Sequence, residues 1–435
     1  MPKITKSFVD TIKPTPNTQV LYWDINLKGF GVRVSPAGKM SYIVQGRVKG
    51  KPETLRVTVG THGKWAPDQA REHAKKLLCL MDQGIDPRAK AKEDATQGMT
   101  LREMTDAYLK SRRSDPKRPM KQSSADEVNR HIDKTFAEWR DKPLKDIKRA
   151  AVQERYEQMR DHGLRGKRPA PGAAAQSLSI LNSVFRFACS RYWKDDDDTP
   201  LFTNPCTKVI ENYSRALSLE PRDTRIPLDK VGAAWNALQT WRASPMTQMH
   251  RANVDLAVFL LLTGARLNEG ALLTWNHVNL DEGWWHLPDP KNRRPIWLPL
   301  STQAAELLRE RPRYSWTNQV FASRLAEDKR AQGPRYVCQK LWEVAGKPVS
   351  PTNPTRKLSP HDLRRTFCDI AEQKCDIVLT HIERLTSHVP SSTTEKHYLN
   401  TKEVQWLQPH VQLIGNWIEE QGKIASGANV VALRA

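Results

Sequence analysis

The stretch TGARLNEGALLTW, residues 263–275, carries the pattern from which the rest of the chain can be interpreted. Gly264 marks a turn, and the residues after it predict the start of a helix, so Arg266 would lie near a helix N-terminus. Backbone N–H groups and the helix dipole favour anions at that position. The stretch therefore predicts an anion-binding arginine, although a single arginine in this setting is more often a surface or ion-pair residue.

A second segment predicts a β-hairpin over residues 283–300, in which two apolar runs flank a Pro-Lys-Asn-Arg-Arg turn. Lys291 lies in this turn. Taken alone it is typical of a solvated turn lysine, and Arg293 and Arg294 share its turn. We prefer Lys291 because it is the only lysine there.

Two more segments hold the remaining candidate residues. SPHDLRRTF places His361 and Arg364 three positions apart, and hence on one face of a helix. SHVPSSTTEKHYL holds His388 and, ten residues later, Tyr398. Each of these residues alone is typical of ordinary surface or packing positions. Their chemistry becomes specific only when they are taken together and in order.

The organisation of the chain follows from changes in its periodicity. Its 435 residues are enough for two or three domains. Residues 1–95 predict a small antiparallel sheet with a helix, residues 99–215 an all-helical domain, and residues 226–410 a mixed, mainly helical domain with one hairpin. Residues 411–435 form a tail whose apolar pattern predicts packing on a neighbouring subunit. The expected fold class is multi-domain and mainly α, with small β elements.

Local signals give finer expectations. Residues 88–98 have the polar, charge-mixed composition of a linker, and Thr100 is suited to cap the helix that follows. The acidic run Asp195–Asp198 is most simply a solvated loop. Strands are expected at residues 19–23, 31–35, 41–48 and 54–59, and helices at 69–83, 128–139, 150–160 and 173–192.

The charge of the chain indicates its partner. Sixty-nine Lys and Arg oppose 48 Asp and Glu, a formal net charge of +21. A folded protein this basic usually binds a polyanion, most often nucleic acid, although a merely basic surface is the alternative. No apolar run approaches the roughly 20 residues of a membrane span. The N-terminus has no signal segment, and the 6 Cys are scattered, so we expect a cytoplasmic, nucleoid-associated protein without a metal site.

In the order Arg266, Lys291, His361-x-x-Arg364, His388 and Tyr398, these residues resemble the active-site set of the tyrosine recombinases, or phage integrases. The stretch GFGVRVSPAGKMSYI is similar to the small arm-site-binding domain of the P4-type prophage and genomic-island integrases, and residues 99–215 resemble their core-binding domain. One departure is Ser387, because the family often has Gly before the histidine. Its Cβ and hydroxyl could crowd that turn.

The resemblance implies a site-specific recombinase that cleaves and rejoins DNA through a 3′-phosphotyrosyl link made by Tyr398. Arg266 and Arg364 would clamp the non-bridging phosphate oxygens, with His388 as a third donor. His361 would act as general base towards the phenol, and Lys291 as general acid towards the leaving 5′ oxygen. Glu269 is better interpreted as a support that pairs with one of the cations.

The same resemblance implies the partners. They are double-stranded DNA at core and arm attachment sites, other copies of the chain in a homotetramer on DNA, and DNA-bending accessory proteins. Neither ATP nor a metal is required, because the phosphotyrosyl bond retains the phosphoester energy. Two alternatives stay open: a non-catalytic DNA-binding regulator with the same fold, and a topoisomerase-like enzyme that shares the chemistry.

Overall fold

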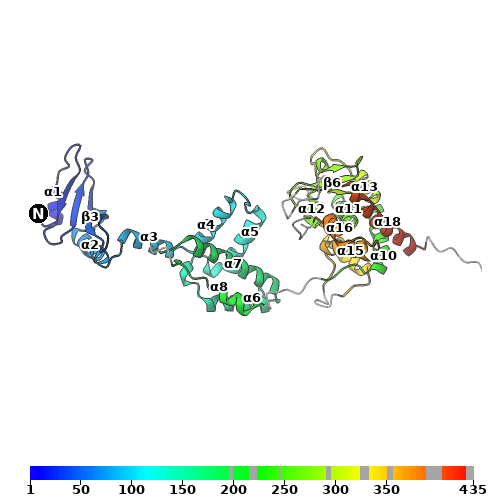
Figure 1. Cartoon of the computed structure of the whole chain (residues 1–435), viewed down its shortest axis with the longest axis horizontal. Helices are drawn as coiled ribbons and strands as arrows, with labels where there is room; N and C mark the ends of the chain where they lie inside the picture. The colour runs from blue at the N-terminus through cyan, green and yellow to red at the C-terminus, as the bar shows by residue number, and fades with distance from the viewer. Residues whose placement is uncertain are drawn as a thin grey trace, which may run out of the picture. The chain divides into compact units, whose positions relative to one another are not determined.

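The structure is a computed structural model that describes residues 1–435 except 195–198, 215–222, 245, 291–294, 324–332, 350–355, 388–403 and 428–435. The chain divides into two compact units, Met1–Leu219 and Glu220–Ala435 (Figure 1). Three separate hydrophobic clusters form the cores: one in the N-terminal sheet, one in the helical part of the first unit and one in the second unit. No helix within the described residues combines the length and apolar character needed to cross a membrane.

The N-terminal part is a four-stranded antiparallel sheet in the order β1-β2-β3-β4, as the sequence predicted. Alternate residues such as Phe30, Val32 and Tyr42 are fully buried, and α2 packs against β3 to cover that face. The predicted helix at 69–83 is confirmed as α2. The elements are α1 Lys6–Thr11, β1 Val20–Trp23, β2 Phe30–Val34, β3 Met40–Arg47, β4 Thr54–Thr61 and α2 Pro67–Asp82.

Residues 88–98, expected to be a linker, are helical, because α3 spans Pro87–Gln97. The Asp86 side chain accepts a hydrogen bond from the backbone N–H of Arg88, 2.8 Å away, and so caps this helix, while Pro87 begins it. Lys90 and Asp94 form an ion pair of 3.1 Å at i,i+4 spacing. Capping and local pairs therefore support a helix that lacks the apolar periodicity on which the prediction depended.

The second part of the first unit is helical, as predicted. Thr100 caps α4, and its hydroxyl accepts from the backbone N–H of Glu103 at 3.2 Å. Residues 128–139 are not one helix, because the end of α5 continues into a π-turn and a short 3-10 turn. The run Asp195–Asp198 lies outside the described residues. The elements are α4 Leu101–Arg113, α5 Gln122–Arg130, η1 His131–Thr135, η2 Ala137–Trp139, η3 Leu144–Asp146, α6 Arg149–His162, α7 Pro171–Arg191 and α8 Cys206–Asn212.

The second unit is built around α11, whose residues Leu256–Leu262 are all buried. Helices α10 and α15 pack against α11, and the predicted hairpin is confirmed as β6 and β7, to which β5 adds a third strand. The elements are η4 Leu228–Lys230, α10 Val231–Ala243, α11 Gln248–Thr263, α12 Leu267–Ala271, η5 Trp275–His277, β5 Val278–Asn279, β6 Trp284–Leu287, β7 Ile296–Pro299, α13 Thr302–Arg309, α14 Arg335–Val344, α15 Pro360–Gln373, α16 Leu379–Leu385, η6 Gln405–Leu407 and α18 Gln408–Ala425.

The predicted tail needs a correction. Helix α18 packs against α10 and α13, and Val411, Ile414 and Ile418 are buried in the hydrophobic cluster of their own unit. The close approach depends on Gly232, where an added Cβ would lie 2.1 Å from the carbonyl oxygen of Gln421. The apolar pattern from Val411 thus serves the chain's own core, whereas the sequence suggested packing on a neighbouring subunit.

Candidate functional site

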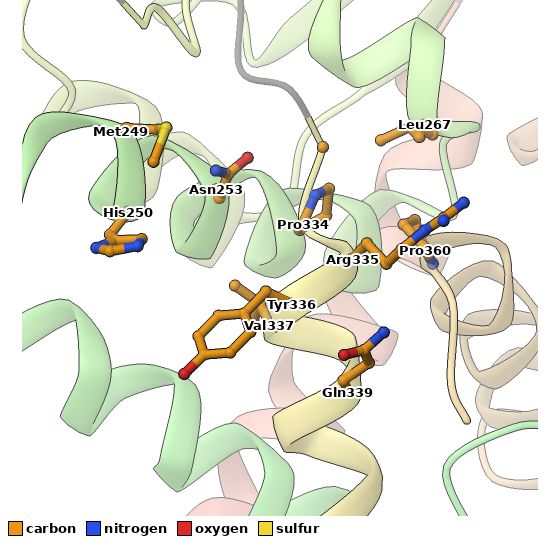
Figure 2. A pocket seen from close by; sticks show the side chains of 11 residues that line it. Met249, His250, Asn253, Leu267, Pro334, Arg335, Tyr336, Val337, Gln339 and Pro360 are labelled. Carbon is orange, nitrogen blue, oxygen red and sulfur yellow. The ribbon is translucent and has the colours of Figure 1, made fainter. Parts of the chain in front are cut away.

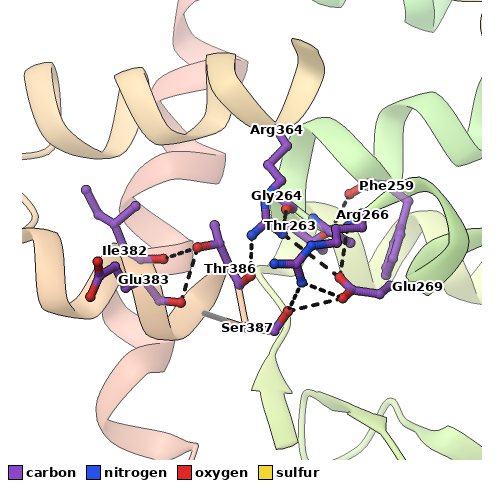
Figure 3. A network of polar contacts seen from close by, with 11 residues as sticks. Phe259, Thr263, Gly264, Arg266, Glu269, Arg364, Ile382, Glu383, Thr386 and Ser387 are labelled. Carbon is purple, nitrogen blue, oxygen red and sulfur yellow. Dashed lines mark hydrogen bonds and ion pairs between the residues drawn. The ribbon is translucent and has the colours of Figure 1, made fainter. Parts of the chain in front are cut away.

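Four helix ends meet at one place in the second unit: the end of α11, the start of α12, the first turns of α15 and the end of α16. They bring together Arg266, Glu269, Arg364 and Ser387, which are up to 121 residues apart in the sequence (Figure 3). Two of the predicted site residues, Arg266 and Arg364, are therefore in one polar network.

Gly264 allows α11 to end sharply next to α12. Its backbone is left-handed, with φ 63°, and an added Cβ would lie 2.5 Å from Cδ1 of Phe367. Two residues later, the backbone N–H of Arg266 donates to the Glu269 carboxylate at 2.9 Å. Glycine at 264 is thus needed both for the backbone conformation and for the close contact with α15.

The carboxylate of Glu269 lies between the two arginines. Its Oε1 is 2.7 Å from Nη1 of Arg266, and its Oε2 is 4.0 Å from Nη1 of Arg364. The Glu269 side chain is only 9% exposed, whereas that of Arg266 is 24% exposed. This pairing confirms the predicted supporting role of Glu269. Two guanidinium groups share one carboxylate, and the more accessible of them is Arg266.

Arg364 is buried and joins two of the helix ends. Its Nη1 donates to the carbonyl of Gly264 at 2.9 Å, and its Nη2 donates to the carbonyl of Thr386. Burial, reinforced by the charge of Arg266, lowers the pKa of Arg364 to about 10. The group is still cationic at neutral pH. It is a charge held inside the protein, and its partners include backbone carbonyls at the ends of α11 and α16.

His361 lies in the first turn of α15, three residues before Arg364, and is exposed. Burial of part of its ring, followed by the charges of Arg365 and Arg364, lowers the pKa of His361 below the ordinary value for histidine. The imidazole is therefore neutral at physiological pH. A neutral imidazole has one ring nitrogen that can accept a proton.

Two residues that support the site were missed or misjudged in the sequence. The fully buried Asp362 accepts hydrogen bonds from the backbone N–H and hydroxyl of Ser359, at 2.8 and 2.7 Å, and pairs with Arg365. The Ser-x-x-Asp spacing at this helix start is a signal that could have identified it. Ser387, expected to crowd its turn, has a left-handed φ of 52° and donates and accepts hydrogen bonds inside the arginine network.

The other three predicted site residues, Lys291, His388 and Tyr398, lie outside the described residues. The described chain does fix where their segments begin. Strands β6 and β7 flank residues 291–294, and Ser387 immediately precedes His388. Within the described residues, no group of three or more His, Cys, Asp or Glu side chains is arranged to hold a metal ion.

A cavity of about 580 Å³ opens beside the same helix starts. Its walls include Leu267, next to Arg266, and Pro360, next to His361, and Figure 2 shows side chains of α11 and α14 around it. Arg335 and Tyr336 from the first turn of α14 line one side. Neither residue was predicted from the sequence. They add a cation and an exposed aromatic ring to the surroundings of the site.

Comparison with known proteins agrees with this architecture. Residues 230–404 match the model of the phage integrase family, and residues 4–94 match that of an arm DNA-binding domain. The chain is therefore a site-specific recombinase of the tyrosine type, with a phage integrase family domain and an arm DNA-binding domain at its N-terminus.

Among individual proteins, the chain is similar to the prophage integrase IntF of Escherichia coli strain K12, with 25% identity over 96% of this chain and 90% of that protein. Two solved structures are also similar. A lambda integrase dimer bound to a COC′ core site has a TM-score of 0.47 at 18% identity, covering 91% of this chain and 99% of that one. The Tn1549 transposon integrase in complex with a circular intermediate DNA has a TM-score of 0.45 at 17% identity, covering 69% and 96%.

Proposed function

We propose that this chain cleaves and rejoins double-stranded DNA through Tyr398, with Arg266, Arg364 and His388 binding the scissile phosphate, His361 as general base and Lys291 as general acid. The observation that carries the proposal is the convergence of Arg266 and Arg364 on the single carboxylate of Glu269. Two cations and one anion leave one positive charge, which matches the single negative charge of a phosphodiester. The transition state carries more charge on the non-bridging oxygens and would be held more tightly still.

In the cleavage step, the Tyr398 oxygen attacks phosphorus, and the bond from phosphorus to the 5′ oxygen breaks. His361, which its lowered pKa keeps in the neutral form, takes the phenol proton, and Lys291 gives a proton to the leaving 5′ oxygen. The products are a 3′-phosphotyrosyl link and a 5′ hydroxyl. A 5′ hydroxyl of the partner duplex then attacks the link, which restores the phosphodiester and the free tyrosine.

We further propose that the protein acts in the cytoplasm as a homotetramer on paired DNA sites, assisted by DNA-bending proteins. Residues 1–95 would bind arm sites, and residues 99–215 and 226–410 would bind the core site. The formal net charge of +21 supports extensive phosphate contacts. In this scheme the attachment sites direct the integration or excision of a mobile element.

Trapping the protein on a nicked duplex that carries its attachment site tests the proposal. Wild-type protein is expected to form a covalent adduct that survives denaturing electrophoresis, and mapping the attached end should place Tyr398 on a 3′ phosphate. Tyr398→Phe should form no adduct while binding the same DNA in a gel-shift assay. An adduct with the Phe variant would mean that another residue is the nucleophile. Wild-type protein that binds and never joins DNA would favour the non-catalytic regulator.

A further inference from the structure

Ser387 has two properties that are unusual together. Its backbone is left-handed, with φ 52°, a conformation that costs a non-glycine residue free energy. The residue is also only 2% exposed, so its hydroxyl must find partners inside the protein. Glycine would suit the backbone better, which indicates that the side chain at this position serves a purpose that outweighs the cost.

The partners of the hydroxyl show what that purpose is. Ser387 Oγ accepts from Nη1 of Arg266 at 2.7 Å and donates to Oε1 of Glu269 at 3.2 Å (Figure 3). Because Nη1 of Arg266 also donates to the same Oε1 at 2.7 Å, the three groups form a closed triangle. Hydrogen bonds to charged groups are stronger than neutral ones. The triangle therefore fixes the guanidinium at one of its three nitrogens.

Fixing this nitrogen orients the others. A guanidinium is planar, so once both protons of Nη1 are directed to Glu269 and Ser387, the directions of Nη2 and Nε follow. Within the described part of the chain, the hydrogen bonds of the Arg266 side chain all fall on Nη1. The side chain is 24% exposed, so the other nitrogens can face a ligand. If Glu269 were its only partner, the Arg266 guanidinium could still rotate about the hydrogen bond between them.

We propose that Ser387 is a positioning residue that orients the Arg266 guanidinium for the scissile phosphate, and that its hydroxyl is retained at a left-handed position for this purpose. The proposal rests on the proposed function, because it assumes that Arg266 binds the phosphate undergoing cleavage. Ser387 acts through Arg266 and touches neither the DNA nor the reacting atoms.

The test compares Ser387→Gly and Ser387→Ala with wild type in the full-length chain. Gly removes the hydroxyl and relieves the backbone, and Ala removes the hydroxyl alone. Both should slow single-turnover adduct formation on a nicked duplex by about 10-fold at saturating protein, with DNA affinity changed by less than about 3-fold. Asp376→Gly is the matched control, because Asp376 is also left-handed, with φ 51°, but exposed. It should cleave at the wild-type rate.

A second measurement does not depend on cleavage. The thermal unfolding of Ser387→Ala, Arg266→Ala and the double variant forms a double-mutant cycle. The change in Tm of the double variant should differ clearly from the sum of the changes in the two single variants. Additive changes would overturn the proposal, as would wild-type cleavage rates for both Ser387 variants. If wild-type protein forms no adduct at all, the proposed function fails, and the unfolding cycle still decides whether Ser387 holds Arg266.

Discussion

Arg71 in the N-terminal sheet domain and Arg364 in the second unit are both buried arginines, 8% and 3% exposed, but their surroundings differ. Arg71 donates from Nε to the buried carboxylate of Asp24 at 2.9 Å and also pairs with Asp68. The hydrogen bond to Asp24 is the main reason that the pKa of Arg71 is raised. Arg364 donates to two backbone carbonyls, shares Glu269 with Arg266 and has a lowered pKa.

The different partners of Arg71 and Arg364 indicate two different roles for a buried arginine. Arg71 lies on α2 and is neutralised by Asp24, which directly follows β1, and by Asp68 in its own helix. It therefore joins α2 to the end of β1 and has no charge left for a ligand. Arg364 also joins elements, through the Gly264 and Thr386 carbonyl groups. It shares the single carboxylate of Glu269 with Arg266, so these three groups together keep one positive charge. Burial and the nearby charge of Arg266 lower the pKa of Arg364, whereas the hydrogen bond to Asp24 raises the pKa of Arg71. The following predictions test this distinction.

Replacement of Arg71 should have the largest effect on the stability of the protein and no effect on the rate of DNA cleavage. Arg71→Met leaves Asp24 buried without its main partner, which should cost about 3–5 kcal/mol in the stability of the N-terminal domain. Hydrogen exchange of the full chain would localise the loss to β1 and α2. The double variant Arg71→Met with Asp24→Asn should recover much of the stability. Slower cleavage of a core-site substrate by Arg71→Met would contradict the assignment.

Replacement of the other arginine should affect chemistry most. Arg364→Lys keeps a cation but cannot reach both the Gly264 and Thr386 carbonyls and a phosphate. We expect adduct formation to slow by about 10²–10³-fold, or about 2.7–4 kcal/mol, with DNA binding largely kept. Single-turnover cleavage and a gel-shift assay measure the two quantities. Equal losses in cleavage and binding would indicate that Arg364 is structural, like Arg71.

The smallest expected effect concerns His361 beside these cations. Because its pKa is lowered, the imidazole stays neutral until the pH falls below about 6.5, the ordinary value. Adduct formation should therefore be independent of His361 protonation near pH 7 and fall by about 10-fold per pH unit below the lowered pKa. His361→Gln should be slow at all pH values and lack this decline. A decline that persists in the variant would assign the base to another group.

The sequence was sufficient for the fold class, the sheet and the pairing of Glu269. The apolar residues of the four strands and the helical apolar pattern of α2 and α7 reflect burial in a core, which a sequence can display. Helix α3 was missed because it is supported by the Asp86 cap and surface ion pairs in place of an apolar face. The sequence could not show which core Val411 packs into, because an apolar helix face fits the core of its own chain as well as that of a neighbouring subunit.

For the site, the order and type of the residues predicted Arg266, Arg364 and His361, but not how their side chains are held. The bonds from Arg364 to the Gly264 and Thr386 carbonyls use backbone atoms, which leave no trace in residue identity. Ser387 was interpreted as an obstacle because its hydroxyl finds partners only across a gap of more than 100 residues. Hydrogen-bond partners that lie this far apart in the sequence are brought together by the fold, so a local sequence pattern cannot predict them.

The bonds of Arg364 also bear on how such a protein would degenerate once selection for strand cleavage ended. Arg364 holds the ends of α11 and α16 together, so its loss would impair folding as well as activity. His361, which is exposed, could change at little structural cost. An inactive descendant that still bound DNA would therefore keep Arg364 long after His361 had drifted, and a preserved arginine there would be poor proof of a working enzyme.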